Sequence, residues 1–459
     1  MRDTPPNADQ QLDLTVQGDI VLDDGMIVQD GWLGVKDETI VAVSSQPLRA
    51  VDHHKACGTL ILPGFVDAHV HTRSSLEEGI TATTYAAAAG GTTTVIDMPF
   101  DRPARPVRDA ETFRQKAEDV GREAIIDVAL YATFAPTGDL DAIADLAGAG
   151  ACGFKVSTFQ VDEDRFPRIP DGQLYEAFRE IAPYGLPVAA HQENQEIVEA
   201  VTARLRAGGP PRAIDHARSR PPVAEAEAAG RLLELAYWTG VHLHMVHGTL
   251  PRTFDRIQWN RTQGVSASGE TCIQYLLLTE DALHRLGGRA KCNPPLRTEA
   301  DAAALWQYLR DRKIDIVTSD HSPYALRLKD TEDIFDAYAG LPGVETLGTL
   351  LYSEGVATGK ITLQRFVEAV ASGPARIFGL PRKGRLQVGY DADFVIFDPN
   401  QTQTLDEQAL HARVGWSPYH GRAVQGRVRA TYLRGRRVFF EDRVVAEPGT
   451  GRFVRPGGT

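Results

Sequence analysis

Residues 60–73 read LILPGFVDAHVHTR, an apolar run that ends in an aspartate and two histidines spaced one residue apart. The apolar part predicts a buried β-strand. Because side chains alternate between the two faces of a strand, Phe65, Asp67, His69 and His71 are predicted to point the same way. In a barrel with this row facing inward, the two imidazoles would lie at the mouth as a natural pair of divalent-metal ligands. Two hydrogen-bonded core histidines are the alternative.

Strand-like and helix-like segments alternate from residue 63 to residue 383. Short apolar runs such as TTTVIDM (92–98) and LPVAAH (186–191) are separated by helical stretches such as 172–185 and 224–240. This alternation predicts an α/β protein with a (β/α)₈ TIM barrel over residues 63–383. The strand-rich segments 1–62 and 384–459 are predicted to fold together as a small β-sandwich domain beside the barrel. Asp24-Gly25 and Asp30-Gly31 are predicted hairpin turns.

Composition excludes several classes of protein. The chain has 459 residues, of which 42% are hydrophobic and 24% charged, and this is typical of a soluble globular protein. It has no apolar run long enough for a membrane span, and its first residues lack the features of a secretion signal, so we expect a cytoplasmic protein without a membrane partner. The net charge of −12, with no basic block, argues against nucleic-acid binding and leaves a small molecule as the expected partner. The four cysteines are expected to be free thiols.

Three further predicted strands end in a residue that suits a metal or acid–base site. LPVAAH ends in His191, VHLHMVH (241–247) ends in His247, and IDIVTSD (314–320) ends in Asp320. By alternation, His242, His244 and His321 are predicted to face away from the barrel interior. Four strands would therefore deliver such residues to one end of the barrel, which favours a metal site over a chance placement of core histidines.

Lys155 is the unexpected member of this set. In GACGFKVS (150–157) the alternation aims this lysine at the same mouth. A protonated amine would be repelled by metal cations, so Lys155 must be neutral, paired with an acid such as Asp320, or chemically modified. The residues themselves leave these three possibilities open.

The chain resembles the cyclic amidohydrolases of the amidohydrolase superfamily, which include dihydroorotases, allantoinases, hydantoinases and dihydropyrimidinases. The resemblance runs along nearly the whole chain and is carried by the order and number of its motifs. These include PGFVDAHVHTR, AAAAGGTTTVIDMP, GFK, AAHQEN, HMVHG, GETCIQYL, KCNPPLR, SDHSP, AGLPGVET, ARIFGL, GRLQVGYDADFVIFDP and SPYHGR.

The resemblance implies a centre with two divalent metal ions. In this family the lysine carries carbon dioxide as a carbamate that bridges the two metals, which would resolve the charge problem at Lys155. The implied ligands of the first metal are His69, His71, Lys155 and Asp320, and those of the second are Lys155, His191 and His247. Zinc is the favoured metal, with manganese, cobalt or iron as alternatives. A metal-bridging hydroxide would attack the ring carbonyl, with Asp320 as the acid–base residue.

The motifs do not agree on the substrate, although they favour an allantoinase-like or hydantoinase-like enzyme, with allantoin slightly ahead. Arg73 and Asn293 match substrate-binding positions of dihydroorotases, but Phe100 replaces the asparagine of that group. SDHSP and SPYHGR resemble allantoinases, whereas GETCIQYL and AGLPGVET resemble hydantoinases and dihydropyrimidinases, which have a tyrosine where this chain has Gln160. Arg73 could instead pair with Glu77 or Glu78, and Asn293 could cap a turn.

Two rival functions stay open. A mononuclear nucleobase deaminase would keep the histidines and Asp320 but would not need Lys155. A non-catalytic scaffold of the dihydropyrimidinase-like kind would have lost metal ligands, whereas this chain keeps the full set. The resemblance also implies a homo-oligomer, either a dimer or a tetramer.

Overall fold

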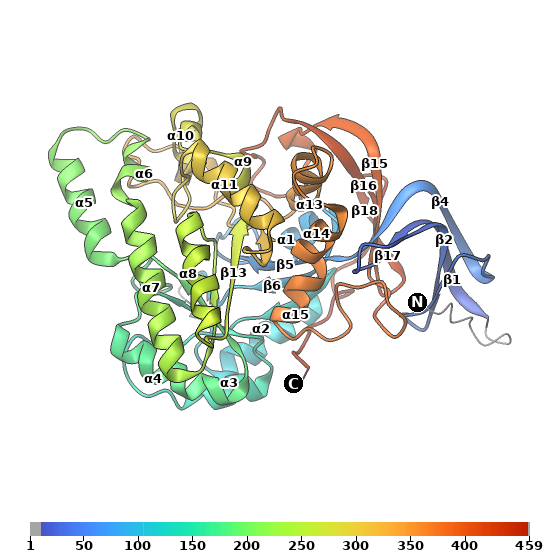
Figure 1. Cartoon of the computed structure of the whole chain (residues 1–459), viewed down its shortest axis with the longest axis horizontal. Helices are drawn as coiled ribbons and strands as arrows, with labels where there is room; N and C mark the ends of the chain where they lie inside the picture. The colour runs from blue at the N-terminus through green and yellow to red at the C-terminus, as the bar shows by residue number, and fades with distance from the viewer. Residues whose placement is uncertain (1–10, 104, 458–459) are drawn as a thin grey trace.

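The computed structural model describes residues 11–103 and 105–457, and a closed barrel of parallel strands is its main feature (Figure 1). Within these ranges the strands form two sheets, in the orders β5-β6-β9 and β10-β11-β12-β13-β14. Bridges between Ala132 and Phe154 and between Val70 and His321 close the ring. The eight strands are β5 (Phe65–Val70), β6 (Thr92–Asp97), β9 (Asp127–Leu130), β10 (Phe154–Ser157), β11 (Pro187–His191), β12 (His242–Met245), β13 (Ala267–Cys272) and β14 (Ile316–Thr318). The predicted (β/α)₈ barrel is confirmed.

Helices connect the strands and cover the outside of the barrel. Their spacing of buried apolar residues, for example Leu174, Ala177, Phe178 and Ile181 in α4, gives each helix one face toward the strands. The larger helices are α1 (Ile80–Ala89), α2 (Ala110–Glu123), α3 (Ala142–Ala149), α4 (Asp171–Ile181), α5 (Gln195–Ala207), α7 (Pro222–Thr239), α8 (Pro251–Thr262) and α11 (Glu299–Arg310). The shorter ones are α6 (Asp215–Ser219), α9 (Ile273–Leu277), α10 (Asp281–Leu286), α12 (Leu326–Lys329), α13 (Leu347–Leu351), α14 (Leu363–Val367) and α15 (Gly373–Ile377). No helix in the described ranges combines the length and apolar character needed to cross a bilayer.

Strand β5 does not point its side chains as simple alternation predicts. Phe65 packs outward against Phe366, with ring centroids 5.6 Å apart, whereas Val66 and Ala68 belong to the apolar cluster inside the barrel. The pairing of β5 with β6 shifts register between Asp67 and Val70. This irregularity ends the two-residue repeat, so His69 reaches the cavity although Phe65 faces the helices.

Strand β12 corrects a second prediction. Leu243 and Met245 pack in the layer between strands and helices, while His244 faces inward against the Phe378 ring at a centroid distance of 5.3 Å. His244 was predicted on the outer face. His247 lies beyond the strand with a left-handed φ of 40°, so a turn of the backbone, and not the strand alternation, carries its ring to the cavity.

Both ends of the chain contribute to one eight-stranded sheet beside the barrel, in the order β18-β17-β16-β15-β4-β1-β2-β3. Figure 1 shows the blue N-terminal strands next to the red C-terminal ones. One face of this sheet has its own core, which includes Val16, Ile61 and Phe394, and Leu62 and Phe397 pack with the barrel helices. The strands are β1 (Leu12–Val21), β2 (Ile27–Lys36), β3 (Thr39–Ser44), β4 (Ala50–Pro63), β15 (Phe394–Thr404), β16 (Ala423–Leu433), β17 (Arg436–Phe440) and β18 (Arg443–Val444).

Only one of the two predicted hairpin turns is a turn. Asp24-Gly25 connects β1 to β2, with Gly25 at a φ of 84°. Asp30-Gly31 instead lies within β2, opposite a shift of register in β1, so it marks a β-bulge. The second hairpin turns at Asp37 and Glu38, which both have positive φ.

A buried network of charges joins the barrel to the terminal sheet. Lys383 Nζ lies 2.6 Å from Asp127 Oδ2, 2.9 Å from Asp391 Oδ2 and 2.8 Å from Asp393 Oδ2. The three aspartates could by geometry hold a cation, but the lysine ammonium already occupies their centre. Arg434 donates to Asp127 as well. Burial would lower the pKa of Lys383, but the three carboxylates outweigh it and raise the pKa, so the ammonium is charged at neutral pH.

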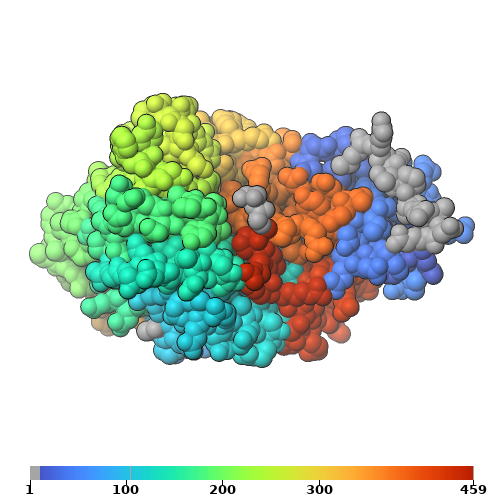
Figure 2. All heavy atoms as spheres, turned by 90° about the horizontal axis from the view of Figure 1, so that it is seen from below, coloured from blue at the N-terminus to red at the C-terminus, as the bar shows by residue number. Residues whose placement is uncertain are grey.

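The C-terminal segment lies against the barrel. The backbone N–H of Val128 in β9 donates to the carbonyl of Arg452, and that of Val454 donates to the carbonyl of Val128. Figure 2 shows this red segment between the cyan part of the barrel and the orange helical part. The C-terminal segment therefore adds a short bridge to the β5-β6-β9 sheet of the barrel.

Candidate metal centre

A small cavity of about 60 Å³ lies at the carboxyl ends of the barrel strands. Its wall includes all six residues predicted as metal ligands, which are His69, His71, Lys155, His191, His247 and Asp320, together with Asn293. The six predicted ligands come from five different strands or the loops that follow them, as is typical of active sites in this kind of barrel.

His69, His71 and Asp320 form one half of the site. Asp320 Oδ1 lies 3.2 Å from His69 Nε2 and 3.5 Å from His71 Nε2. One ligand atom from each of the three side chains falls within 4.8 Å of the others. Asp320 has a left-handed φ of 45°, so the backbone turns at the end of β14 to aim the carboxylate at the imidazoles. This set could hold a divalent cation.

Lys155 is the most unusual group in the cavity. It lies on β10, its side chain is fully buried, and Nζ has no hydrogen-bond partner among the described residues. Burial lowers the pKa of this amine to about 8, against the opposing charges of Glu270 and Asp320. A buried amine without a partner is costly, so its retention at this point indicates a role that the protein atoms do not fulfil.

His191 and His247 form the other half of the site. His191 Nδ1 lies 3.0 Å from His247 Nε2, so both rings direct a nitrogen toward the same point. The other nitrogen of His191, Nε2, bonds to Glu193 at 2.8 Å, and Arg220 donates to the same carboxylate oxygen. Glu193 therefore fixes the orientation of the His191 ring.

Burial sets the protonation of these groups. It lowers the pKa of His71 to about 4, and burial with the nearby His191 and Lys155 lowers that of His247 well below its usual range. Burial would raise the pKa of Asp320, but the charge of His69 and a hydrogen bond from His71 outweigh it and lower the pKa. His71 and His247 are thus neutral and Asp320 is ionised at neutral pH, the forms in which these side chains bind metal.

Glu270 contacts the candidate site, and no sequence pattern predicted it. Its Oε1 atom accepts hydrogen bonds from His69 Nδ1 at 2.5 Å and from the His247 backbone N–H at 3.2 Å, and Oε2 lies 3.2 Å from His244 Nε2. The residue ends no apolar run, because β13 reads ASGETC, so the pattern that identified the other strand ends does not apply to it. Glu270 orients two ligand segments at once.

Replacing Glu270 with glutamine is expected to weaken divalent-metal binding about 10- to 100-fold, the usual effect of losing a carboxylate behind a ligating histidine. A glutamine side chain has only one acceptor oxygen. Its NH₂ group would therefore face one of the N–H donors whose hydrogen bond the Glu270 carboxylate now accepts. Competition with a chelator measures the change. Glu345→Gln is the matched control, since Glu345 is a partly buried glutamate bonded to a histidine, His411, away from the cavity. Equal metal affinity in the two variants would contradict the assignment.

The structure does not bring Arg73 to the cavity. Its guanidinium donates to Asp119 at 2.7 Å and to Glu123 at 3.0 Å, both on α2. Arg73 therefore does not pair with Glu77 or Glu78, and its role in substrate binding stays a prediction. Asn293 does line the cavity, and its buried Oδ1 has no hydrogen-bond partner within the described ranges.

The donor set fits a divalent metal. Four imidazoles and one carboxylate are the ligand types that suit zinc and related transition metals. A second observation also fits a divalent metal, namely that Nζ of Lys155 has no hydrogen-bond partner among the described residues. If this amine were converted into a carbamate, it would present oxygen ligands in place of a cation. His321 lies outside the cavity, where its Nδ1 accepts from the Gly343 backbone N–H at 3.1 Å.

Residues 60–438 match the Amidohydrolase family. The chain is 39% identical to an allantoinase of Rubrobacter xylanophilus, over 97% of this chain and 98% of that protein. It is 36% identical to an allantoinase of Solibacter usitatus, over 94% and 96%. Among solved structures, an L-hydantoinase (dihydropyrimidinase) from Arthrobacter aurescens superposes with a TM-score of 0.93 at 32% identity and covers 97% of this chain and 100% of its own.

Proposed function

The chain belongs to the amidohydrolase family as a cyclic amidohydrolase of allantoinase or hydantoinase type, and we propose that allantoin is its substrate, with hydantoins next. The observation that supports the chemistry is the convergence of four imidazoles, Asp320 and an unpartnered buried amine on one cavity. The similarity to allantoinases along almost the full length of the chain supports the choice of ring.

We propose that Lys155 is carbamylated and that the site holds two divalent metals. His69, His71, Lys155 and Asp320 would hold the first metal, and Lys155, His191 and His247 the second. Zinc is the favoured metal, with manganese, cobalt or iron as alternatives. The pKa of about 8 at Lys155 supports the modification, because the neutral amine is the form that adds carbon dioxide and releases a proton.

Bound divalent metals would supply Lewis-acid chemistry, which lowers the pKa of water toward 7 and polarises a carbonyl. The residues of the chain handle the proton. Asp320, ionised and directed into the cavity, accepts a proton from the attacking water and then donates it to the departing ring nitrogen. The water oxygen bonds to the ring carbonyl carbon as the C–N bond breaks. The products of this step are a carboxylate and a free amide within one open-chain molecule.

Asn293 is the proposed contact to the ring. Its buried Oδ1 has no partner among the described residues and lines the cavity, so it can accept a hydrogen bond from a ring N–H. A cyclic ureide presents such an N–H beside the attacked carbonyl. Asn293 would therefore orient the ring with respect to Asp320.

Several other predictions stay proposals. They are the division of the chain into domains at residues 62/63 and 383/384, the β-sandwich form of the terminal sheet, a cytoplasmic location, and a dimeric or tetrameric state. Trp238 and Trp259, on α7 and α8, are 70% and 62% exposed, and this surface would suit contact with a second copy of the chain.

Kinetics on a panel of cyclic amides test the proposed substrate. With added divalent metal and bicarbonate, we expect the highest kcat/KM for allantoin, then hydantoin, and values at least about tenfold lower for dihydroorotate, dihydrouracil and simple cyclic imides. The position that matches the carboxylate-binding arginine of dihydroorotases is Arg73, and it is engaged by α2. Preference for dihydroorotate or dihydrouracil would instead favour a dihydroorotase or dihydropyrimidinase. Deamination of a nucleobase by protein with one bound metal would favour a mononuclear deaminase. Protein that has neither metal nor activity would favour a non-catalytic scaffold.

A further inference from the structure

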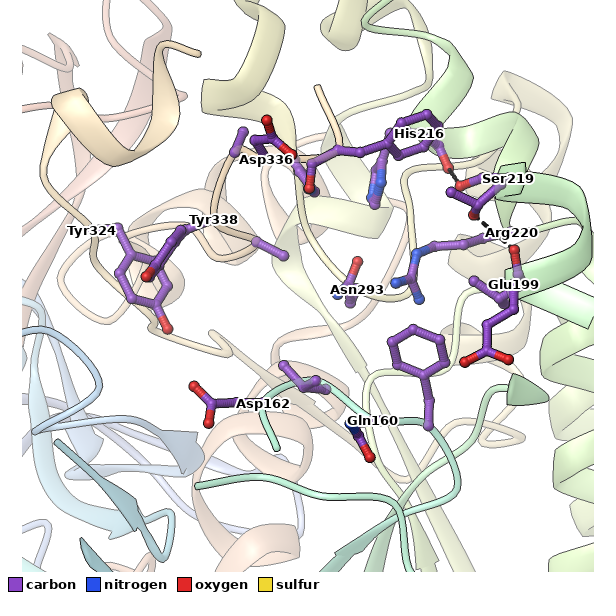
Figure 3. A pocket seen from close by; sticks show the side chains of 18 of the residues that line it. Gln160, Asp162, Glu199, His216, Ser219, Arg220, Asn293, Tyr324, Asp336 and Tyr338 are labelled. Carbon is purple, nitrogen blue, oxygen red and sulfur yellow. Dashed lines mark hydrogen bonds between the residues drawn. The ribbon is translucent and has the colours of Figure 1, made fainter. Parts of the chain in front are cut away.

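A second, larger pocket of about 640 Å³ adjoins the metal cavity and opens toward solvent (Figure 3). Val161, Arg165, Asn293, Tyr324 and Ala339 line both spaces. In Figure 3 Arg220 and Asn293 project into the middle of this outer pocket, with Tyr324 and Tyr338 across from them. The inner cavity is small, so a ring held there would direct any substituent past the shared wall into the outer pocket.

Arg165, in the loop after β10, is a buried cation in that shared wall. The residue is 5% exposed, and its Nη1 donates to the carbonyl of Phe100 at 2.9 Å. Its Nε has no hydrogen-bond partner in the described part of the chain. The nearest carboxylate oxygen, Asp162 Oδ2, lies 3.7 Å from Nε, beyond hydrogen-bond distance. A buried guanidinium usually has a hydrogen-bonded acid, whereas Arg165 has, among the described residues, only this longer ion pair with Asp162.

The position of Arg165 is fixed by its neighbours. Phe166, the next residue, stacks on Phe100 with ring centroids 3.8 Å apart, and the carbonyl of Phe100 accepts from the guanidinium. Phe166 also lines the metal cavity. Because these contacts hold one edge of the guanidinium, its remaining N–H groups are left for a ligand at the boundary between the two spaces.

Most other cations of the outer pocket already have bonded partners. The exception is Arg102, whose Nε is also without a hydrogen-bond partner among the described residues, but Arg102 does not line the metal cavity. Arg220 donates to Glu193 and lies 4.4 Å from the Phe159 ring centroid, and Arg206 lies 3.2 Å from Asp336. Lys291 Nζ donates to two backbone carbonyls, at 2.8 and 2.9 Å. Arg165 thus differs from them in having both direct access to the metal cavity and unused donors.

We propose that Arg165 is a specificity-determining residue that donates hydrogen bonds to a carbonyl or carboxylate oxygen on the substituent of the substrate ring. A planar guanidinium is suited to such oxygens, and its burial strengthens the interaction. The enzyme would therefore select rings with a polar, oxygen-bearing substituent, such as the ureido group of allantoin, over unsubstituted rings or rings with an apolar group. This inference rests on the proposed ring-opening function.

The kinetics of Arg165→Gln on matched substrates test the proposal. We expect kcat/KM for allantoin to fall about 10- to 100-fold, mainly through KM, because a charge-assisted hydrogen bond is lost. For unsubstituted hydantoin and 5-isopropylhydantoin the change should stay within about threefold, since neither carries an acceptor on the ring substituent. Arg165→Lys should recover part of the loss for allantoin.

Arg168→Gln is the matched control, because Arg168 lies in the same loop but bonds to Glu196 and lines neither space. Metal content and thermal melting establish that each variant keeps its fold. An equal loss for allantoin and hydantoin, or no loss for allantoin, would overturn the role of Arg165.

The two proposals fail in different ways. Wild-type protein that opens none of these rings would refute the proposed function, and dissociation constants for allantoin and hydantoin would then test Arg165 directly. The inference is supported if the wild type binds allantoin more tightly than hydantoin and Arg165→Gln loses this preference. It is contradicted if the wild type binds the two rings with equal affinity. A wild type that prefers dihydroorotate would refute allantoin as substrate, and selective loss of that carboxylate-bearing ring in Arg165→Gln would still support Arg165.

Discussion

Asp320→Asn is expected to lower kcat about 10²- to 10⁴-fold on the best cyclic amide, the usual contribution of a positioned acid–base group. The asparagine amide has nearly the same shape and an oxygen that can still face His69 and His71, so metal content should stay close to that of the wild type. It cannot accept a proton from water or return one to the ring nitrogen. Steady-state kinetics and metal analysis on the same preparation measure both effects.

Asp330→Asn is the control for this substitution. Asp330 is an acid of a barrel loop that bonds to Arg289 and lines neither the metal cavity nor the outer pocket, so its replacement should leave kcat within about twofold. Near-normal turnover by a fully metallated Asp320→Asn variant would remove Asp320 from the proposed mechanism.

Lys155→Ala is expected to lower kcat on the order of 10³-fold or more, because it affects metal binding as well as proton transfer. The variant should also bind less metal and lose any dependence of activity on bicarbonate. A short carboxylic acid such as propionate should restore part of both properties, since its carboxylate can take the place of the proposed carbamate in the space left by the side chain. Metal titration with and without propionate measures this.

Lys329→Met separates a specific effect from the general effect of removing a buried lysine. Lys329 is also buried, but its Nζ donates to the carbonyls of Lys291, Tyr338 and Gly340, so it has a structural role. This variant should lose stability and keep its metal stoichiometry. If Lys155→Ala keeps full activity with a single tightly bound metal, the site is of the mononuclear deaminase type.

The fold was predictable because its signals are local. Apart from β13, whose sequence is ASGETC, the barrel strands are short runs rich in apolar residues and are followed by helical stretches, so the order of elements can be read along the chain. The direction of individual side chains was less predictable. The register shift in β5 and the left-handed residues His247 and Asp320 change which side chains face the cavity, and alternation within a run contains no information about them.

The same limit applies to the site. The six predicted ligands lie together because each lies near or just beyond the carboxyl end of a barrel strand, a place that sequence can locate. The hydrogen-bond partners of Arg73, Arg165 and Glu270 lie far away in the sequence. Asp119 and Glu123 are 46 and 50 residues from Arg73, Phe100 is 65 residues from Arg165, and His69 is 201 residues from Glu270. Such contacts depend on how strands meet in space, which composition and periodicity do not specify.

The Lys383 network has a consequence for how the molecule denatures. Its members come from the start of β9, from the segment that leads into β15 and, through Arg434, from the turn between β16 and β17. Separating the terminal sheet from the barrel would take from Asp127 the two cations, Lys383 and Arg434, that now compensate its charge, which is unfavourable. The two parts are therefore expected to melt in a single cooperative transition, and calorimetry should record one heat-absorption peak, not two.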